Sequence, residues 1–355
     1  MFEQKLHFTW ETIQKIIQKI GVIDSFRGKW QGIELKNNRY LRELRRIATI
    51  ESIGSSTRIE GATLTDTEVE QLIKNVKITE FQSRDEEEVF GYFETLDIIL
   101  DSYEDLELSE NYIKQLHSIL LKFSQKDNRH RGTYKNLPNK VVANYPDGSQ
   151  RTIFNTTEPH LTEKEMSEML AWVQENVAKR NIHPLIIIGL FVYEFLSIHP
   201  FQDGNGRLSR LLTTLLLLKN DYGFAQYISF ENIIEDRKQD YYRVLMAGQQ
   251  NRYSSEENIS EWLLFFLECI ETLIQRLEQK YAIYQVKGAY LNERQQKVRA
   301  IIEQFQPVKL ADIVNKLPDT SINTLKKDLQ YLQVEGSIKK IGDRKASIYL
   351  LRKTE

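Results

Sequence analysis

Twelve consecutive residues combine side chains and glycines that suit the binding of a phosphate chain. They are His199, Pro200, Phe201, Gln202, Asp203, Gly204, Asn205, Gly206, Arg207, Leu208, Ser209 and Arg210. The two glycines and the asparagine between them leave backbone N–H groups uncovered at the start of a predicted helix, where the helix dipole favours an anion. The two arginines, three positions apart, present planar donor forks from neighbouring helical positions. The segment therefore predicts a nucleotide-phosphate site.

Two residues of this segment could supply reaction chemistry. Asp203 offers a hard oxygen ligand of the kind that Mg²⁺ accepts together with substrate phosphates. His199 could take a proton from an attacking hydroxyl, because an unperturbed imidazole is largely neutral near pH 7. Taken alone, a histidine before proline or a Gly-x-Gly string is more often structural. Their combination within one short segment favours the functional interpretation. The other histidines have no such set of neighbours in the sequence and are interpreted as structural or exposed: His7, His117, His130, His160 and His183.

Two apolar runs are expected to hold this segment in place. Residues 184–197 and 211–218 are apolar almost all round, which predicts two buried helices joined by the polar segment at the rim of a core. Most of the first 290 residues have helical periodicity, and capping boxes predict helix starts at Thr65, Ser83 and Thr162. The fold class is therefore mainly α. Residues 140–154 read as strand, turn and strand, either a flap over the site or a decorated loop.

The C-terminal residues differ in charge and pattern. Residues 291–355 carry 13 basic and 8 acidic side chains, a net of +5, against −7 for residues 1–290. Three helices are predicted at 293–305, 310–317 and 322–334, the third capped by Asp319 and terminated by Gly336, followed by a hairpin at 337–351. This order describes a winged helix, which could bind DNA or protein. Polar side chains on its third helix and in its wing could contact a partner: Asn323, Lys326, Lys327, Gln330, Arg344 and Lys345.

Composition excludes several classes of protein. The chain has 355 residues and a formal charge of −2, and its longest apolar stretch is too short to span a bilayer. Its start does not read as a secretory signal, so a cytoplasmic protein is expected. The single cysteine, Cys269, excludes an intramolecular disulfide and a multi-cysteine zinc site. We expect an N-terminal helical region at 1–105, a catalytic core at 106–285 with its flap at 138–155, and the winged helix at 290–355.

The segment from His199 to Arg210 resembles the defining motif of Fic-domain proteins, and the resemblance extends over most of residues 30–270. It implies a helical Fic core with a hairpin flap, and an enzyme that transfers AMP from ATP to a serine, threonine or tyrosine hydroxyl of a protein, releasing pyrophosphate. By this resemblance His199 is the general base and Asp203 holds Mg²⁺. Gly204, Asn205 and Gly206 form the anion hole, and Arg207 and Arg210 bind the β- and γ-phosphates.

The string Ser56-x-x-x-Glu60-Gly61 resembles the inhibitory motif of the N-terminally inhibited class of this family. The resemblance implies that Glu60 pairs with Arg210 and keeps the ATP γ-phosphate out of its productive position. It further places Tyr242 and Gln249 in the adenosine pocket and Val141 and Val142 in the flap, which would pair with an extended target segment. Alternatives stay open: removal of AMP from a modified protein, or an ATP-sensing regulator that binds DNA. The chain itself is one candidate target, and a homodimer is expected.

Overall fold

The computed structural model describes residues 2–34, 39–75, 81–144, 150–287, 293–318, 320–334, 337–342 and 347–352. The chain divides into two compact units, residues 1–277 and 278–355. The first unit contains both the N-terminal region and most of the core that the sequence predicts as separate domains. In the described residues, no helix is both long enough and apolar enough to cross a membrane.

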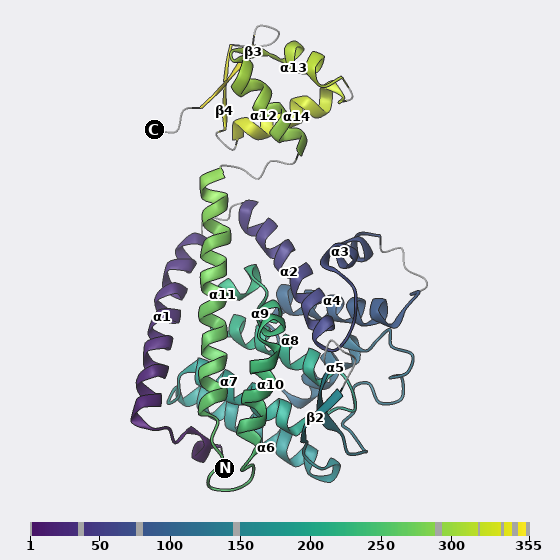
Figure 1. Ribbon diagram of the computed structural model, residues 1–355, viewed down its shortest axis with the longest axis vertical. Helices are drawn as coiled ribbons and strands as arrows, with labels where there is room; N and C mark the ends of the chain where they lie inside the picture. The colour runs from purple at the N-terminus through teal and green to yellow at the C-terminus, as the bar shows by residue number, and fades with distance from the viewer. Residues whose placement is uncertain are drawn as a thin grey trace. The chain divides into compact units, whose positions relative to one another are not determined.

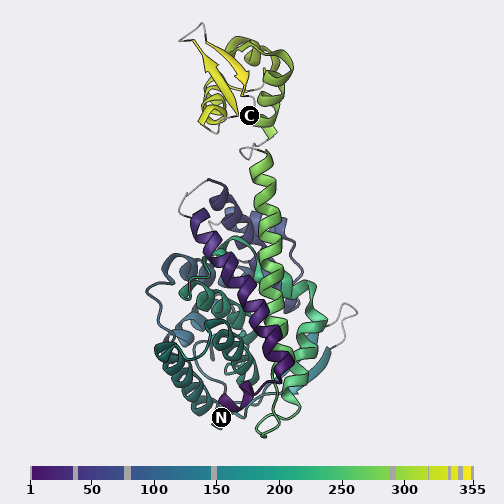
Figure 2. The same cartoon turned by 90° about the vertical axis from the view of Figure 1, so that its left-hand side faces the viewer.

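The first unit is helical, as predicted, with one small hairpin (Figure 1). Its elements, in chain order, are η1 Glu3–Leu6, α1 Trp10–Glu34, α2 Arg39–Ile59, α3 Asp66–Lys74, α4 Arg84–Ser102, α5 Glu110–Leu120, β1 Lys140–Asn144, β2 Gln150–Asn155, α6 Pro159–Lys179, α7 Pro184–Ile198, α8 Asn205–Lys219, η2 Gly223–Tyr227, α9 Phe230–Asp236, α10 Lys238–Gln249 and α11 Ser260–Lys287. Helices α1 and α11 lie side by side (Figures 1 and 2), and Lys19 Nζ of α1 lies 2.7 Å from Glu271 Oε2 of α11.

Helix α7 is the central helix of this core. Nearly every residue from Leu185 to Ile198 is buried, because the helix is apolar on all faces and packs between α6 and α8. Pro184 occupies its first turn, and the His183 side chain accepts a hydrogen bond from the Leu185 N–H. At the other end, His199 terminates the helix in the left-handed conformation, with φ of 52°. The sequence prediction of two buried helices joined by a polar segment agrees with α7 and α8.

Helix starts were predicted with mixed success. Thr65 and Glu68 form the expected capping box at the start of α3. Ser83 caps α4 by accepting from the Glu86 N–H, although the Glu86 carboxylate binds the N–H of Gln82 rather than that of Ser83. The prediction at Thr162 is wrong. Helix α6 begins three residues earlier at Pro159, and the Thr162 hydroxyl donates to the Glu158 carbonyl from inside the first turn.

The hairpin consists of the antiparallel strands β1 and β2. Val141 pairs with Phe154, but Val142 pairs with Thr152, so the register shifts between the two valines. This shift is a bulge, which locally increases twist and re-aims neighbouring side chains. The predicted turn at 145–149 lies outside the described residues.

The second unit has its own core. Its elements after α11 are α12 Glu293–Phe305, β3 Val308–Lys309, α13 Leu310–Lys316, α14 Ile322–Val334, β4 Ile338–Ile341 and β5 Ile348–Leu351, and the strands form an antiparallel sheet in the order β3-β5-β4. Buried residues from every one of these helices and strands meet in the core, among them Val298, Ile313, Leu325, Leu329 and Ile338. Three helices and a following hairpin occur in the predicted order, and the short strand β3 was missed. Asp319, Gly336, Arg344 and Lys345 lie outside the described residues.

Candidate phosphate-binding site between helices α7 and α8

The connection between α7 and α8 is locked from within by the side chain of Asn205. The backbone N–H of Phe201 donates to Asn205 Oδ1 at 2.8 Å, and Asn205 Nδ2 donates to the Phe201 carbonyl at 2.7 Å. Phe201 is fully buried, and its ring stacks on His117 with centroids 3.8 Å apart. The amide of Asn205 therefore fixes the loop, which leaves its backbone N–H, rather than its side chain, for an anion.

The two glycines of the motif meet separate steric demands. Gly204 has φ of 79°, a left-handed conformation that glycine adopts without strain. At Gly206, an added Cβ would lie only 2.3 Å from the Glu60 carboxylate. The absence of a side chain there lets the acid that directly follows α2 approach the first turn of α8.

Asp203 is a partly exposed carboxylate surrounded by positive charge. Its Oδ1 accepts from the Gly204 N–H at 2.6 Å and lies 3.3 Å from Arg207 Nη2, while Oδ2 accepts from Lys126 Nζ at 2.8 Å. Burial alone would raise the pKa of Asp203, but Arg207 and Lys126 hold that pKa well below its usual range. Asp203 is therefore ionised at all physiological pH values, as a cation ligand must be.

His199 is arranged as a neutral base. Its Nδ1 lies 3.2 Å from the Leu196 carbonyl oxygen, which can only accept, so the proton resides on Nδ1 and Nε2 keeps its lone pair. Burial, assisted by the positive charge of Lys135, lowers the pKa of His199 to about 4. The imidazole is thus uncharged near pH 7 and able to accept a proton.

Lys135 is a buried lysine that the sequence analysis missed. Its Nζ donates to Asn139 Oδ1, Thr156 Oγ1 and the Ile198 carbonyl, each at 2.8 Å. These three acceptors belong to the two ends of the hairpin and to the last residue of α7. Asn139 Nδ2 in turn donates to the Phe201 carbonyl at 2.7 Å. The base of the hairpin is therefore tied to the segment that holds His199.

Arg210 is enclosed by residues of α2 and the turn that follows it. Arg210 Nη2 lies 2.8 Å from Glu60 Oε1 and donates to the Ser56 carbonyl, while Arg210 Nε donates to Ser56 Oγ at 2.9 Å. The arginine is only 3% exposed. Gly61 follows with φ of 110°, which turns the chain away directly after the acid. The structure thus brings Ser56 and Glu60 to Arg210, from which they are 154 and 150 residues apart in sequence.

Arg207 is buried with two nitrogens that lack a hydrogen bond. Its Nη2 donates to Asp203 Oδ1 at 3.3 Å, whereas its Nη1 forms only an ion pair with Glu88 Oε2 at 3.2 Å. Neither Nε nor Nη1 makes a hydrogen bond to any described residue. A buried donor without a partner costs free energy, so these atoms suit an incoming phosphate oxygen.

The residues also fit a magnesium ion carried by a nucleotide. Within the described parts of the chain, no three His, Cys, Asp or Glu side chains gather as a metal-binding cluster. A single carboxylate such as Asp203 is nevertheless the usual protein contribution where Mg²⁺ is held mainly by phosphates and water. The side chain of Lys126, which binds this carboxylate, is half exposed and can withdraw.

The remaining predicted residues lie at the edges of this site. Gln249 donates to the Ser197 hydroxyl, two residues before His199. The ring of Tyr242 is half-buried and contacts Tyr241, with centroids 5.3 Å apart. Val141 is buried and Val142 partly exposed, beside the bulge of the hairpin. The roles of Tyr242, Val141 and Val142 stay predictions.

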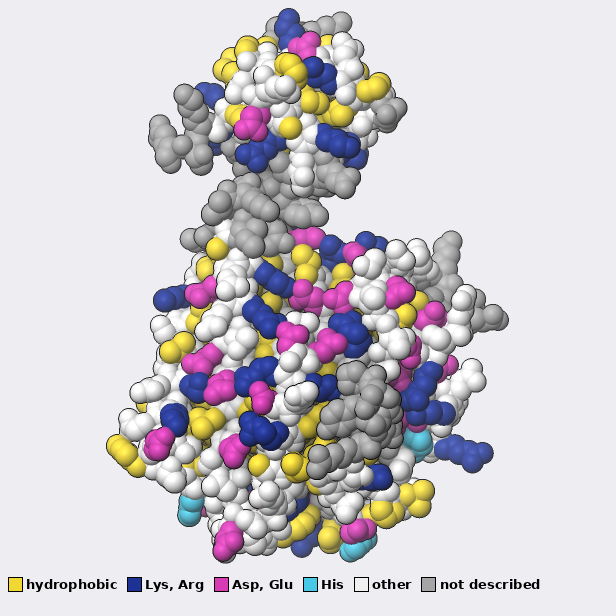
Figure 3. All heavy atoms as spheres, in the orientation of Figure 1, with side chains coloured by type: hydrophobic (Ala, Val, Ile, Leu, Met, Phe, Trp, Pro, Cys, Tyr) yellow, Lys and Arg dark blue, Asp and Glu magenta, His cyan; other side chains and the backbone are white. Residues whose placement is uncertain are grey.

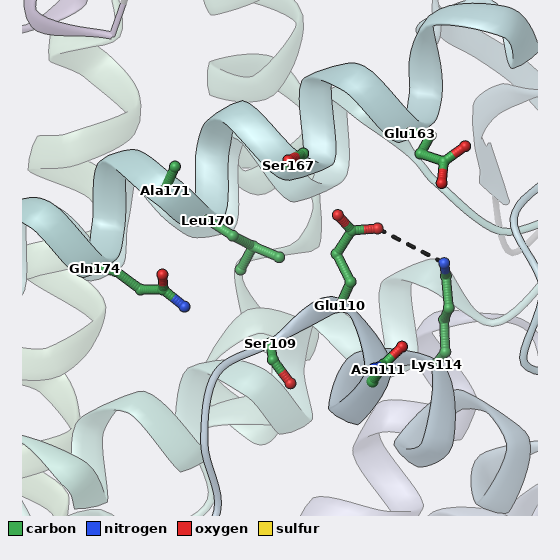
Figure 4. Close-up of a pocket in the computed structure, with 9 residues that line it drawn as sticks. All are labelled: Ser109, Glu110, Asn111, Lys114, Glu163, Ser167, Leu170, Ala171 and Gln174. Carbon is green, nitrogen blue, oxygen red and sulfur yellow. Dashed lines mark ion pairs between the residues drawn. The ribbon is translucent and has the colours of Figure 1, made fainter.

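Two cavities among the described residues lie away from the motif. One, of about 440 Å³, lies between α5 and α6 and is lined by polar side chains including Glu110, Lys114 and Gln174 (Figure 4). Glu110 also accepts from the Tyr134 hydroxyl, and Tyr134 packs on Phe201. The other, of about 400 Å³, lies among α2, α3 and α4. Neither contains a residue of the segment from His199 to Arg210.

Comparison with known proteins points to one family for the segment that holds the motif. Residues 107–217, which include α7, the motif and most of α8, match the Fic/DOC family. It is 25% identical over 256 residues to a protein adenylyltransferase Fic of Drosophila willistoni, and 26% identical over 267 residues to that of Drosophila erecta. These matches cover 72% and 74% of this chain but only 46% and 48% of the relatives. The chain thus spans about half the length of the curated relatives it matches.

Solved structures show the same fold. A Fic family protein from Desulfovibrio desulfuricans G20 matches with a TM-score of 0.65 and 24% identity, over 98% of each chain. A Fic domain containing signaling protein from Bacteroides thetaiotaomicron matches with a TM-score of 0.60 and 24% identity, over 76% of this chain and 99% of that one. At these identities the likeness establishes the helical Fic fold.

Proposed function

We propose that this chain is an auto-inhibited protein adenylyltransferase, which transfers AMP from ATP to a hydroxyl of a protein. The observation that carries the proposal is the arrangement around α8. A neutral histidine with a free Nε2 precedes a helix N-terminus that presents Asp203 and two buried arginines, one of them bound by Glu60. The curated relatives named protein adenylyltransferase Fic support the same reaction.

The proposed reaction assigns a role to each of these groups. His199 Nε2 takes the proton of the target hydroxyl as its oxygen attacks the α-phosphorus of ATP. The bond between the α-phosphorus and the bridging oxygen breaks, and pyrophosphate leaves. Backbone N–H groups of α8, together with Arg207 and Arg210, stabilise the negative charge of the phosphates. Mg²⁺, held by Asp203 and the phosphates, would neutralise further charge on the leaving group.

The same geometry explains the proposed inhibition. Arg210 donates two hydrogen bonds to Ser56 and one to the Glu60 carboxylate. A γ-phosphate must therefore compete with Glu60 for this guanidinium. A carboxylate beside the first turn of α8 also repels an incoming phosphate chain. Glu60 is therefore proposed to favour the inactive state.

The test measures label transfer from ATP labelled at the α-phosphate, with Mg²⁺ and cell lysate, for wild type, Glu60→Gly and His199→Ala. We expect strong protein labelling with Glu60→Gly and weak labelling with wild type. Adding His199→Ala to Glu60→Gly should reduce labelling by about 10²- to 10⁴-fold, which is the usual contribution of a general base. Glu107→Gly is the matched control, since Glu107 is an exposed carboxylate in a coil segment.

Two outcomes contradict the proposal. Equal labelling by wild type and Glu60→Gly would remove the inhibitory role of Glu60. Absence of labelling from every variant that still binds ATP would remove adenylyl transfer, and release of AMP from a modified protein would then be measured instead.

A further inference from the structure

The charge of helix α14 in the C-terminal unit is one-sided. Its only acidic residue, Asp328, is 3% exposed and faces the core of the unit. There its carboxylate accepts from Arg294 Nε at 2.6 Å and from Gln295 Nε2 at 3.2 Å. The negative charge of α14 is thus neutralised beneath the helix, and its solvent face keeps only positive charge.

That solvent face carries a regular set of side chains. Lys326 and Lys327 are exposed, as are Ile322, Asn323 and Gln330, at positions that recur every four residues. Leu325, Leu329 and Leu332 occupy the opposite face and are buried. The exposed residues are therefore not required for the core, and Ile322, 48% exposed, leaves an apolar side chain in water at the first turn.

Two further exposed lysines lie on β4. This strand packs against α14, and its Lys339 and Lys340 are exposed, one on each face of the strand. Lys and Arg are prominent on the face of this unit that Figure 3 shows. Over residues 291–355 the net charge is +5, in a chain whose overall charge is −2.

This combination matches the chemistry of a DNA major groove. Lysines at two adjacent positions can contact phosphates, and asparagine and glutamine amides can bond to adenine edges. An exposed isoleucine suits the methyl group of thymine. An acidic protein surface would use the lysines but would leave the two amides and the isoleucine without a specific role. A single helix also fits the width of the major groove.

We propose that the C-terminal unit binds double-stranded DNA by placing the exposed face of α14 in the major groove. The proposal goes beyond adenylyl transfer and does not depend on it. It concerns a surface in the second compact unit, which shares no residue with the phosphate site.

The experiment uses the full chain and a fluorescein-labelled 24-base-pair duplex of mixed sequence. Anisotropy titrations in a salt series from 50 to 200 mM give the affinity and its salt dependence. We expect micromolar binding at the lowest salt, and at least a tenfold loss for Lys326→Glu combined with Lys327→Glu. Removal of two phosphate contacts should also reduce the slope of log affinity against log salt by about 2.

The matched control reverses two exposed lysines on one helix of the first unit, Lys164 and Lys179 of α6, with the same change of net charge. Equal loss of affinity in this control, or no binding by wild type at 50 mM salt, would overturn the proposal. A circular dichroism melt of each variant establishes that the unit is folded. The double variant Asn323→Ala with Gln330→Ala should lose less affinity than Lys326→Glu with Lys327→Glu, because it keeps both lysines.

Discussion

Individual residues set the protonation state of the proposed base. The Leu196 carbonyl fixes the tautomer of His199, and burial and Lys135 lower its pKa to about 4. Lys135 acts at a distance through its charge while its own three donors hold the hairpin and the end of α7. One lysine therefore links the position of the base to its readiness to accept a proton.

This link predicts the pH dependence of transfer. With a pKa of about 4, His199 stays neutral and the rate in a Glu60→Gly background should be nearly constant between pH 8 and pH 5.5. Lys135→Met removes a nearby positive charge, so the pKa of His199 should rise, although burial, the larger cause of its low value, remains. The protonated base is inactive, so the rate of this variant should begin to fall at a higher pH than the rate of its Glu60→Gly parent.

The initial rate of label transfer checks this expectation. Lys140→Met removes an exposed lysine at the start of β1 and serves as the control. Protonation of ATP and its effect on Mg²⁺ binding change with pH in the same way for both variants. If the profile of Lys135→Met coincides with that of Lys140→Met, Lys135 does not set the protonation of His199.

At the scale of secondary structure, the end of α2 is held by three neighbouring elements. Arg58 Nε and Nη2 bind the two oxygens of Glu235 on α9 at 2.8 and 3.0 Å, and Arg58 Nη1 binds Asp66 on α3 at 2.9 Å. Lys238 Nζ of α10 donates to the Ile59 carbonyl at 2.7 Å. These contacts fix the residues directly before Glu60, so they should determine how well the acid reaches Arg210.

Weakening this attachment should relieve inhibition in part. Glu235→Gln keeps the shape of the side chain but loses its charge, so the bidentate pair with Arg58 weakens. We expect several-fold faster label transfer than wild type, yet slower than Glu60→Gly. Asp236→Asn on the same helix, whose partner is Arg276, should leave the rate unchanged.

Combination with Glu60→Gly distinguishes this cause from others. If Glu235 acts through Glu60, adding Glu235→Gln to Glu60→Gly should give no further increase. An additive increase, or an unchanged rate in the single variant, would refute the attachment as the cause.

Local sequence explains part of this architecture. The apolar runs of α7 and α8 and the alternation of the hairpin predicted those elements, because burial on all faces and period-2 alternation leave a direct pattern. The prediction that Thr162 caps a helix is wrong because α6 begins earlier, at Pro159. The two-residue strand β3 is too short to show a pattern. The contact of Glu60 with Arg210 was expected only through the family resemblance.

Other contacts of the site were beyond sequence reasoning. The bidentate pair of Arg58 and Glu235 joins residues 177 positions apart, and Lys135 reaches a carbonyl 63 positions away. A lone lysine or glutamate in the sequence gives no sign of such a partner, since most are exposed. Only the packing of α2 and of the hairpin base onto the core creates these sites.

At the scale of the first unit, a buried ionic cluster joins segments from its beginning and its end. Lys5 Nζ lies 2.5 Å from Glu194 Oε1 of α7 and 2.9 Å from Glu257 Oε1. Arg252 completes the cluster at 3.2 Å from both Glu194 and Glu165 of α6. The side chains of Lys5, Glu194 and Glu257 are each no more than 5% exposed. The N-terminal residues thus neutralise acids in the middle of the core.

Removal of Lys5 should therefore destabilise the whole unit. Lys5→Met keeps most of the apolar volume but leaves the buried carboxylates of Glu194 and Glu257 and the partly buried Glu165 with one cation, Arg252. Such a change typically costs about 3–5 kcal/mol. For a unit of this size the midpoint of thermal unfolding should fall by roughly 10 °C, measured by calorimetry. Lys15→Met, which removes an exposed pair with Glu11, should change this midpoint by less than about 2 °C.

Adding Glu194→Gln to Lys5→Met should restore part of the lost stability, since one excess negative charge is then removed. A midpoint for Lys5→Met equal to that of Lys15→Met would show that the cluster does not hold the N-terminal segment to the core.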